Sequence, residues 1–287
     1  MRFAKTLSAA FFGFLAGGSA YAQEEALTSD LPVIGIPQPG GIAFQPASTS
    51  VAHDIHFLDN MLLVIITLIV LFVTALLVVV AIKFRASKGH EAARFTHNTT
   101  VEIAWTIVPV VILVIIGAFS LPKLFDQLEV PEADVTIKAT GYQWYWGHEY
   151  PDSGVYFESY MLAEEDLAEY GYGPETYLLA TDTAVVVPVG AVVKLQTTAA
   201  DVIHSWKIPA FGVHIDAVPG RLNETWFRVD EPGIYFGQCS ELCGISHTYM
   251  PITVKAVPQD EYDAWLAAAV ERYADGGAPV TQVAAAE

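Results

Sequence analysis

The sequence predicts an all-β domain held at a membrane by an N-terminal hairpin of two helices. Two apolar segments, 61–82 and 103–122, contain no charged residue. Each has the ~20 residues that a helix needs to cross a bilayer. The chain after them is built from short segments rich in Val, Thr, Tyr and Trp, separated by Gly, Pro and Asp. This spacing of short strands and turn residues is typical of an antiparallel sandwich or barrel.

The first 22 residues have the pattern of an export signal. Arg2 and Lys5 precede a short apolar run, and Ala-Tyr-Ala stands before Gln23 as at a small-residue cleavage site. We expect a cleaved signal peptide over 1–22, with an uncleaved anchor as the alternative. Residues 23–57 are rich in Pro, Gly and Ser, which predicts an extended arm without regular structure. The Gly- and Ala-rich residues 275–287 predict a disordered tail.

The loop inside the hairpin indicates its orientation. The hairpin is predicted over 58–124, and its loop carries Lys83, Arg85, Lys88 and Arg94 against only Glu91. Basic loops stay on the cytoplasmic side of a membrane. Both ends of the hairpin, and the whole chain from residue 125 onward, are therefore expected outside the cytoplasm, which agrees with the export signal.

Within the β-domain, 134–146 begins with the alternation of a strand, and 184–199 is interrupted at Pro188 and Gly190 like a strand, a turn and a second strand. Residues 161–173 predict a loop with a helical turn. Residues 259–274 predict a helix, because their apolar side chains recur on one side of a helical projection.

Charge is distributed unevenly along the chain. Residues 1–124 hold 7 acidic and 7 basic residues, whereas 125–287 hold 25 acidic and 7 basic residues, so the net charge of −18 lies in the β-domain and its tail. Such an acidic domain excludes nucleic acid as a partner. Its charge can attract a basic protein, or it can simply keep the domain soluble.

Potential metal ligands follow one another near the end of the β-domain, at Cys239, Cys243, His247 and Met250. Thiolate, imidazole and thioether groups together favour copper over magnesium or calcium. His204, 35 residues before Cys239, offers a second imidazole from another strand or loop. Two thiolates can bridge two copper ions, each completed by one histidine, with Met250 as a weak ligand of one ion and a backbone carbonyl at Glu241 as a ligand of the other. Such a centre suits electron transfer without a bound substrate.

Two simpler interpretations of the cysteines remain open at this point. An oxidising compartment permits a disulfide between Cys239 and Cys243, but a loop this short gives a disulfide little stabilising value. A structural zinc site is the second alternative, although the spacing differs from that of usual zinc ribbons. A disulfide would leave His204, His247 and Met250 without a role.

Several stretches of the sequence, FGQCSELCGISHTYMPI, DVIHSW, GYQWYWGHEY, DAVPGR and ARFTHNTTVEIAWT, together resemble subunit II of the haem–copper cytochrome c oxidases, of the bacterial type related to the mitochondrial enzyme. The resemblance covers nearly all of the chain after residue 22. It implies a cupredoxin-like Greek-key β-barrel over 125–274, on the periplasmic side of a bacterial inner membrane, that carries a dinuclear copper centre (CuA). The copper ligands that it implies are His204, Cys239, Glu241 through its carbonyl, Cys243, His247 and Met250. The carboxylate of Glu241 would also reach a magnesium or manganese ion shared with the catalytic subunit.

The same resemblance implies roles for residues outside the metal motif. Trp144 would receive the electron from cytochrome c. Acidic residues near it would dock the basic face of that protein: Glu149, Glu158, Asp182 and Asp201. Glu102, at the cytoplasmic start of the second span, would open a proton pathway, and an ionisable group at a membrane boundary supports that hypothesis.

The function that the resemblance implies is that of an electron-accepting subunit in an oxidoreductase. Electrons would pass from cytochrome c to CuA and then to haem in the catalytic subunit I, where oxygen is reduced to water with proton pumping, among further oxidase subunits and membrane lipid. This chain alone would reduce no oxygen. A quinol oxidase subunit would lack the copper ligands, and a copper chaperone would not need the acidic domain. A nitric oxide reductase with a similar copper subunit is not separated from the oxidase by the ligands.

Overall fold

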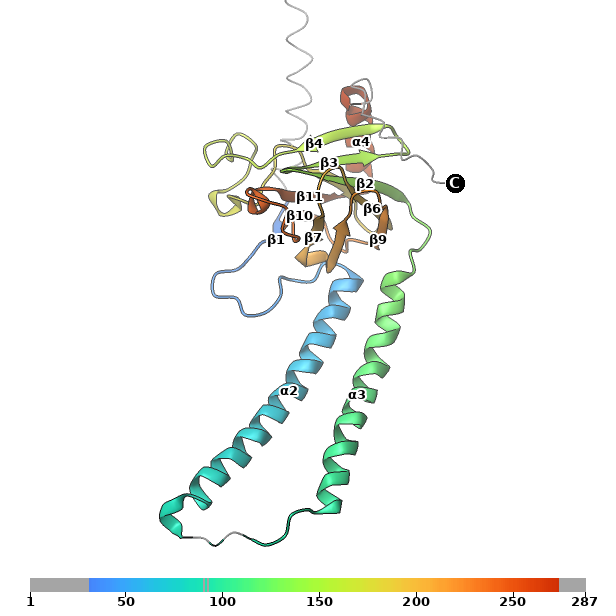
Figure 1. Cartoon of the computed structure of the whole chain (residues 1–287). Helices are drawn as coiled ribbons and strands as arrows, with labels where there is room; N and C mark the ends of the chain where they lie inside the picture. The colour runs from blue at the N-terminus through green and yellow to red at the C-terminus, as the bar shows by residue number, and fades with distance from the viewer. Residues whose placement is uncertain (1–30, 90, 92, 274–287) are drawn as a thin grey trace, which may run out of the picture. The chain divides into compact units, whose positions relative to one another are not determined.

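The computed structural model describes residues 31–89, 91 and 93–273 (Figure 1). The chain divides into two compact units. One is a β-domain made of the residues up to 53 and from 130 onward, and the other is a helical hairpin of residues 54–129. The predicted signal peptide over 1–22 and the predicted tail over 275–287 lie outside the described residues.

The hairpin consists of α2 (Ser50–Lys83) and α3 (Thr99–Leu128), with a short 3-10 helix, η1 (Ala86–Lys88), in the connection. Both are long and apolar enough to span a membrane, and their apolar windows are not buried within the chain. The two predicted spans are therefore confirmed as helices. The α2 helix begins well before residue 61 because the Thr49 hydroxyl accepts a hydrogen bond from the backbone N–H of Ala52 at 3.0 Å, which caps the first turn.

The α3 helix also begins earlier than the apolar pattern predicts. The Asn98 side chain accepts a hydrogen bond from the Val101 N–H at 3.3 Å, and the Glu102 carboxylate accepts one from the Asn98 N–H at 3.2 Å. These reciprocal bonds resemble a capping box, with the carboxylate four rather than three residues after the N-cap. Because the helix starts at Thr99, Pro109 lies in its interior.

Contacts near the Ser50 end of α2 and the Leu128 end of α3 join the two helices. Lys123 on α3 forms an ion pair with Asp54 on α2. The ammonium group of Lys123 also lies 5.2 Å from the ring centroid of Phe57, whose ring packs against Phe119 at 6.0 Å. Charge and ring packing therefore hold the two helices together at this end.

The β-domain contains two sheets and a separate two-stranded hairpin. In order across the first sheet, the strands are β1 (Val33–Gly35), β10 (Gly233–Gln238), β11 (Pro251–Val257) and β5 (Val185–Pro188). In order across the second, they are β4 (Val155–Ser159), β3 (Tyr145–Tyr150), β2 (Val135–Tyr142), β6 (Val193–Ala199) and β9 (Asn223–Phe227). The two-stranded hairpin pairs β7 (His204–Ile208) with β8 (Val213–Ala217).

Strand directions in the two sheets are mixed rather than purely antiparallel. The pairs β1 with β10, β5 with β11, and β2 with β6 are parallel, and the others are antiparallel. The arm expected to be irregular over 23–57 contributes β1 and the first turns of α2, which corrects that expectation. Its Ile34 packs on the core, and β1 exists because the edge of β10 offers backbone partners.

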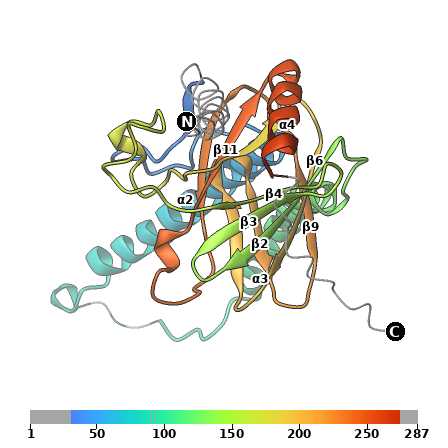
Figure 2. The ribbon, with the colours of Figure 1, turned by 90° about the horizontal axis from the view of Figure 1, so that it is seen from above.

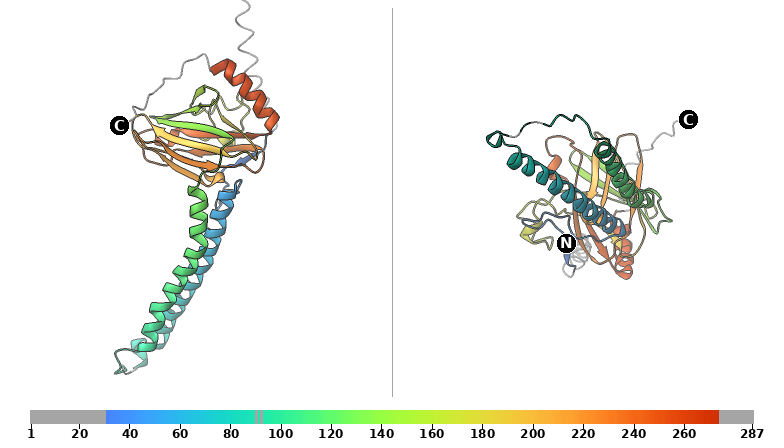
Figure 3. Two further views of the ribbon diagram at one scale, coloured as in Figure 1. Left: turned by 90° about the vertical axis from the view of Figure 1, so that its right-hand side faces the viewer. Right: turned by 90° about the horizontal axis from the view of Figure 1, so that it is seen from below.

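Burial within the domain follows the strand pattern. Side chains of β2 and β6 alternate between buried and half-buried, while every residue of β11 is buried. The predicted C-terminal helix is confirmed as α4 (Gln259–Tyr273), which lies against β4 and β5 (Figures 2 and 3). Its Trp265 packs against Tyr150 with ring centroids 5.2 Å apart. The loop expected over 161–173 has no strand, and the short 3-10 helices η2 (Pro174–Thr176), η3 (Pro209–Phe211) and η4 (His247–Tyr249) complete the domain.

One buried histidine on β3 should make the stability of the domain depend on pH. His148 is fully buried, its Nδ1 lies 3.2 Å from the Ser159 hydroxyl, and its ring packs against Phe157. Burial lowers the pKa of His148 to about 3 from the usual 6.5. Between these two values the unfolded chain binds a proton that the folded chain excludes, so stability falls as the pH drops below 6.5.

We expect the free energy of unfolding to be lower by about 2 kcal/mol at pH 5 than at pH 8 from this group alone. Chemical unfolding of the full chain in detergent, followed by near-ultraviolet circular dichroism, measures this difference. The variant His148→Gln should lose that part of the pH dependence. An unchanged slope in the variant would assign the acid sensitivity to other groups.

Candidate metal centre

The predicted metal ligands lie at the junction of three strands. Cys239 follows the end of β10, and Met250 precedes the first residue of β11. The loop between these strands carries Cys243 and leads into η4, which begins at His247. His204 is the first residue of β7. The loop between β10 and β11 thus presents four candidate side-chain ligands, and β7 brings the fifth.

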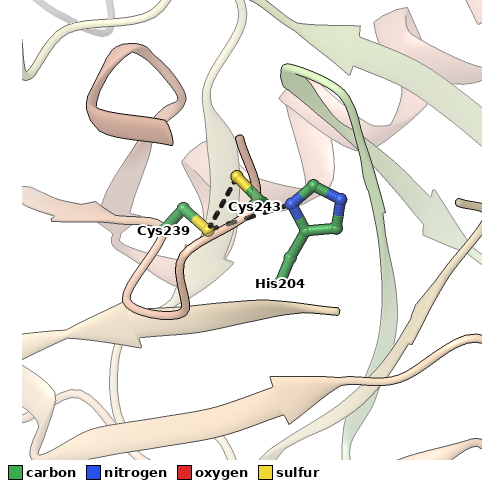
Figure 4. A group of neighbouring side chains, drawn as sticks. All are labelled: His204, Cys239 and Cys243. Carbon is green, nitrogen blue, oxygen red and sulfur yellow. Dashed lines mark hydrogen bonds between the residues drawn. The ribbon is translucent and has the colours of Figure 1, made fainter. Parts of the chain in front are cut away.

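Short distances join these side chains into one group, of which Figure 4 shows His204, Cys239 and Cys243. The sulfurs of Cys239 and Cys243 are 3.9 Å apart. The Nδ1 atom of His204 lies 3.9 Å from the Cys239 sulfur, and Nδ1 of His247 lies 3.6 Å from the Cys243 sulfur. The Met250 sulfur lies 3.6 Å from the Cys243 sulfur. Each thiol is therefore faced by an imidazole nitrogen.

The two cysteines are free thiols in this structure. Their sulfurs are far beyond the ~2.05 Å of a disulfide bond, so the disulfide interpretation is not what the structure shows. The carbonyl oxygen of Glu241 lies 3.3 Å from the Cys239 sulfur, so a backbone oxygen borders the group as well. Among the described residues, His204, Cys239 and Cys243 bring their ligand atoms within 4.8 Å of one another.

Burial separates the three sulfurs and the His204 ring from water, whereas His247 is half-buried. His204 is fully buried, and Cys239, Cys243 and Met250 are at most 6% exposed. The nearby tryptophan Trp146 is also fully buried, and its ring meets the His204 ring edge-on at 5.9 Å. Soft sulfur and nitrogen donors in a dry pocket fit copper and do not fit magnesium or calcium.

The two thiols influence each other's ionisation. Burial alone would raise the pKa of Cys239, but hydrogen bonds with His204 and with the Ser205 and Glu241 backbone lower it to about 7. Burial raises the pKa of Cys243, and the negative charge on Cys239 raises it further. Two neighbouring thiolates repel each other, so a metal ion held by both cysteines would supply the positive charge that favours loss of the second proton.

A hydrogen-bonded carboxylate sets the orientation of the His204 ring. The Nε2 atom of His204 lies 2.9 Å from Oδ1 of Asp201, which leaves Nδ1 directed at the Cys239 sulfur. Metal-binding histidines commonly use the second ring nitrogen in this way. Burial raises the pKa of Asp201, but bonds from His204 and the N–H groups of Val202 and Gln143 outweigh it and lower that pKa. Asp201, predicted as a docking residue, thus contacts a candidate ligand.

Trp144 lies next to the metal-ligand loop. Its indole N–H donates to the carbonyl of Cys243 at 3.2 Å, and the side-chain amide of Gln143 donates to the same carbonyl at 2.8 Å. Trp144 is only partly buried. The structure therefore places the predicted electron acceptor one hydrogen bond away from a candidate ligand residue. Gln143 was missed by the sequence analysis, because glutamine before tryptophan carries no metal-site signal.

The other predicted docking residues differ in their surroundings. Glu149 pairs with Lys138 at 3.0 Å. Glu158 accepts hydrogen bonds from the hydroxyls of Tyr156 and Tyr160, and Asp182 accepts one from the Tyr160 N–H at 2.8 Å. Glu149 is thus partly neutralised within the chain, whereas the Glu158 carboxylate is held by two neutral hydroxyl donors.

The remaining predicted site residues have simpler environments. The Glu102 carboxylate caps α3 in the hairpin unit, as described above. Glu241 is exposed, and among the described residues no other acidic group joins it in a metal-binding cluster.

The hairpin of apolar helices and the buried sulfur and nitrogen ligands define the class of protein: a membrane-anchored β-domain built for a copper centre. The family described as cytochrome c oxidase subunit II, periplasmic domain, matches residues 135–257, and its transmembrane domain matches residues 37–123. The chain belongs to the cytochrome c oxidase subunit II family. It is accordingly a subunit of a haem–copper oxidase, an oxidoreductase complex, and its electron-transfer role follows from the family.

Similar proteins share most of the chain. Cytochrome c oxidase subunit 2 of Cereibacter sphaeroides is 57% identical over 268 residues, which are 88% of this chain and 87% of that protein. Cytochrome c oxidase subunit 2 of Arabidopsis thaliana is 42% identical over 237 residues, 80% of this chain and 89% of that protein. A solved periplasmic domain of subunit II of cytochrome oxidase from Bradyrhizobium japonicum is 49% identical, covers 50% of this chain and 99% of its own, and has a TM-score of 0.46.

Proposed function

We propose that this chain accepts electrons from a basic cytochrome c outside the cytoplasm and passes them through a CuA centre to haem in the catalytic subunit I. Oxygen is reduced to water there, with proton pumping. The observation that carries this proposal is a pair of free, buried cysteine sulfurs 3.9 Å apart, each faced by an imidazole nitrogen. That arrangement can bridge two copper ions.

The proposed ligands are His204, Cys239, the Glu241 carbonyl, Cys243, His247 and Met250. Copper held there would supply reversible one-electron transfer. The chain's own residues orient the donors and exclude water. Asp201 keeps Nδ1 of His204 directed at the Cys239 sulfur. The backbone N–H of Ser240 donates to the Ser205 carbonyl at 3.0 Å, which ties the metal-ligand loop to β7.

Three further assignments belong to the proposal. The basic hairpin loop supports a cytoplasmic position for that loop and a periplasmic position for the β-domain at a bacterial inner membrane. Glu102 would open a proton pathway in addition to capping α3. Glu241 would contribute one carboxylate to a magnesium or manganese site completed by the catalytic subunit. The family match supports the oxidase over the nitric oxide reductase that the ligands alone left open.

The test uses the intact oxidase complex purified from the membrane. We expect two copper ions in this chain that share one unpaired electron, seen by electron paramagnetic resonance as hyperfine structure from two equivalent nuclei. The complex should reduce oxygen rather than nitric oxide. A signal from one copper nucleus in this chain would reduce the proposal to a mononuclear centre. Turnover of nitric oxide in place of oxygen would overturn the assigned reaction.

The surroundings of the predicted docking acids lead to a ranked prediction. Glu158→Gln should raise the KM for cytochrome c about two- to fivefold, with kcat unchanged, as expected for an exposed ion pair of about 0.4–1 kcal/mol. Glu149→Gln should have a smaller effect, because Lys138 already pairs with it. Steady-state kinetics over a range of ionic strength measure these effects. A larger effect from Glu149 than from Glu158 would contradict the ranking.

A further inference from the structure

We infer that Gln143 is a positioning residue that holds Trp144 and two copper ligands in one hydrogen-bonded unit. The inference rests on the proposed function, in which Trp144 accepts the electron and His204 and Cys243 bind copper. It assigns Gln143 the role of keeping the indole ring against the metal-ligand loop. The distance and contact between the ring and the metal then stay constant during electron uptake.

The first part of this unit converges on one carbonyl group. The Nε2 atom of Gln143 donates to the Cys243 carbonyl at 2.8 Å, and Nε1 of Trp144 donates to the same oxygen at 3.2 Å. A carbonyl oxygen has two lone pairs and can accept both bonds. Gln143 and Cys243 are 100 positions apart in the sequence. The two side chains therefore fasten the turn between β2 and β3 to the metal-ligand loop.

The second part runs through the backbone of the same residue. The N–H of Gln143 donates to Oδ2 of Asp201 at 2.7 Å, and Oδ1 of Asp201 lies 2.9 Å from Nε2 of His204. The side chain of Gln143 thus contacts Cys243 on the loop. Its backbone N–H connects to His204 on β7 through the carboxylate of Asp201. Gln143 is an exposed residue, yet its amide donates to the Cys243 carbonyl in the metal-ligand loop.

The loop is shaped to receive the indole ring. Gly244 follows Cys243 and has a φ of +124°, a backbone conformation that residues with a Cβ atom rarely adopt. A Cβ atom at this position would lie 3.0 Å from Cζ2 of Trp144 and 3.1 Å from Nε2 of Gln143. The absence of a side chain at Gly244 therefore allows both residues to approach the loop closely enough for their bonds to Cys243.

Electron transfer between Trp144 and the metal depends on this contact, just as other reactions depend on the alignment of their partners. Trp144 is partly exposed, so packing alone does not enclose its ring. Removing the Gln143 amide leaves the indole N–H of Trp144 to donate alone to the Cys243 carbonyl. Sites whose supporting residues are lost become looser without losing their ligands. The expected defect is slow electron uptake by an intact copper centre.

The experiment compares Q143L with two other variants in the purified oxidase complex. Q143L removes the amide but keeps the backbone bond to Asp201. Q196L is the matched control, because the Gln196 amide donates to Glu224 at 2.6 Å on an exposed part of β6. W144F tests the proposed electron acceptor itself. Each complex is characterised by its copper content, its electron paramagnetic resonance spectrum, and its KM for cytochrome c. The rates of electron transfer from bound, photoreduced cytochrome c to copper, and from copper to haem, are also measured.

For Q143L we expect the rate of electron uptake from bound cytochrome c to fall about tenfold, below the ~100-fold that a 1 Å misplacement can cost. Copper content, spectrum, KM and the copper-to-haem rate should stay as in the wild type, and Q196L should change nothing. Wild-type uptake in Q143L together with slow uptake in W144F would overturn the inference and leave the proposed function standing. Wild-type uptake in W144F would instead overturn Trp144 as the acceptor. Loss of copper in Q143L would overturn a positioning role in favour of a role in metal binding.

Discussion

Replacing Cys243 with serine is expected to remove the copper centre and to stop electron uptake from cytochrome c. The Cys243 sulfur lies close to three other donors of the group, with the Cys239 sulfur at 3.9 Å and the His247 and Met250 donors at 3.6 Å. A serine hydroxyl is a hard ligand that stays protonated at neutral pH, so it cannot bridge two copper ions. Loss of a residue that only hydrogen-bonds a metal ligand costs about 10–100-fold in metal affinity. Loss of a ligand itself should therefore lower the copper affinity by more than ~100-fold.

Metal analysis and oxygen consumption by the purified complex measure this effect. Cys239→Ser should behave in the same way, because each thiolate would be a copper ligand in the proposed centre. Ser240→Ala is the matched control, since Ser240 lies beside Cys239 and its bond to Ser205 comes from the backbone. A Cys243→Ser complex with full copper content and wild-type electron uptake would refute the assignment of this site.

Replacing Gly141 with alanine is expected to displace His204 and weaken copper binding about 10- to 100-fold, the range seen when the orientation of a ligand is lost. Gly141 lies on β2 directly against the His204 ring. A Cβ atom at this position would lie 2.6 Å from Cδ2 and 2.8 Å from Cγ of that ring. The ring is fully buried and bordered by Trp146, so it has little space into which it can move. Overpacking of this kind also costs about 1–3 kcal/mol of stability.

Copper titration and the electron paramagnetic resonance spectrum distinguish this effect from simple unfolding. Gly147→Ala is the control on the neighbouring strand β3, where Gly147 pairs with Thr140. Its added Cβ would lie 2.9 Å from the Tyr156 hydroxyl, and none of its nearest contacts is a candidate ligand. Equal copper affinity in the two variants would show that the steric clash with His204 does not weaken copper binding.

Much of this protein is determined by local patterns in its sequence. The uncharged segments 61–82 and 103–122 predict two helices because their length and hydropathy are properties of each segment alone. The C-terminal helix and the division at Pro188 and Gly190 follow from local periodicity and turn residues in the same way. The soft ligands between Cys239 and Met250 are close in the sequence, so their shared chemistry is visible without a fold.

Only the tertiary structure decides how these parts are completed. The strand β1 forms because β10 offers it an edge, and Gly141 matters because β7 brings His204 against it. Asp201, Gln143 and Cys243 acquire their joint role from hydrogen bonds that span up to 100 sequence positions. No local pattern encodes such contacts, because they exist only after the strands have packed and buried the groups that must then find partners.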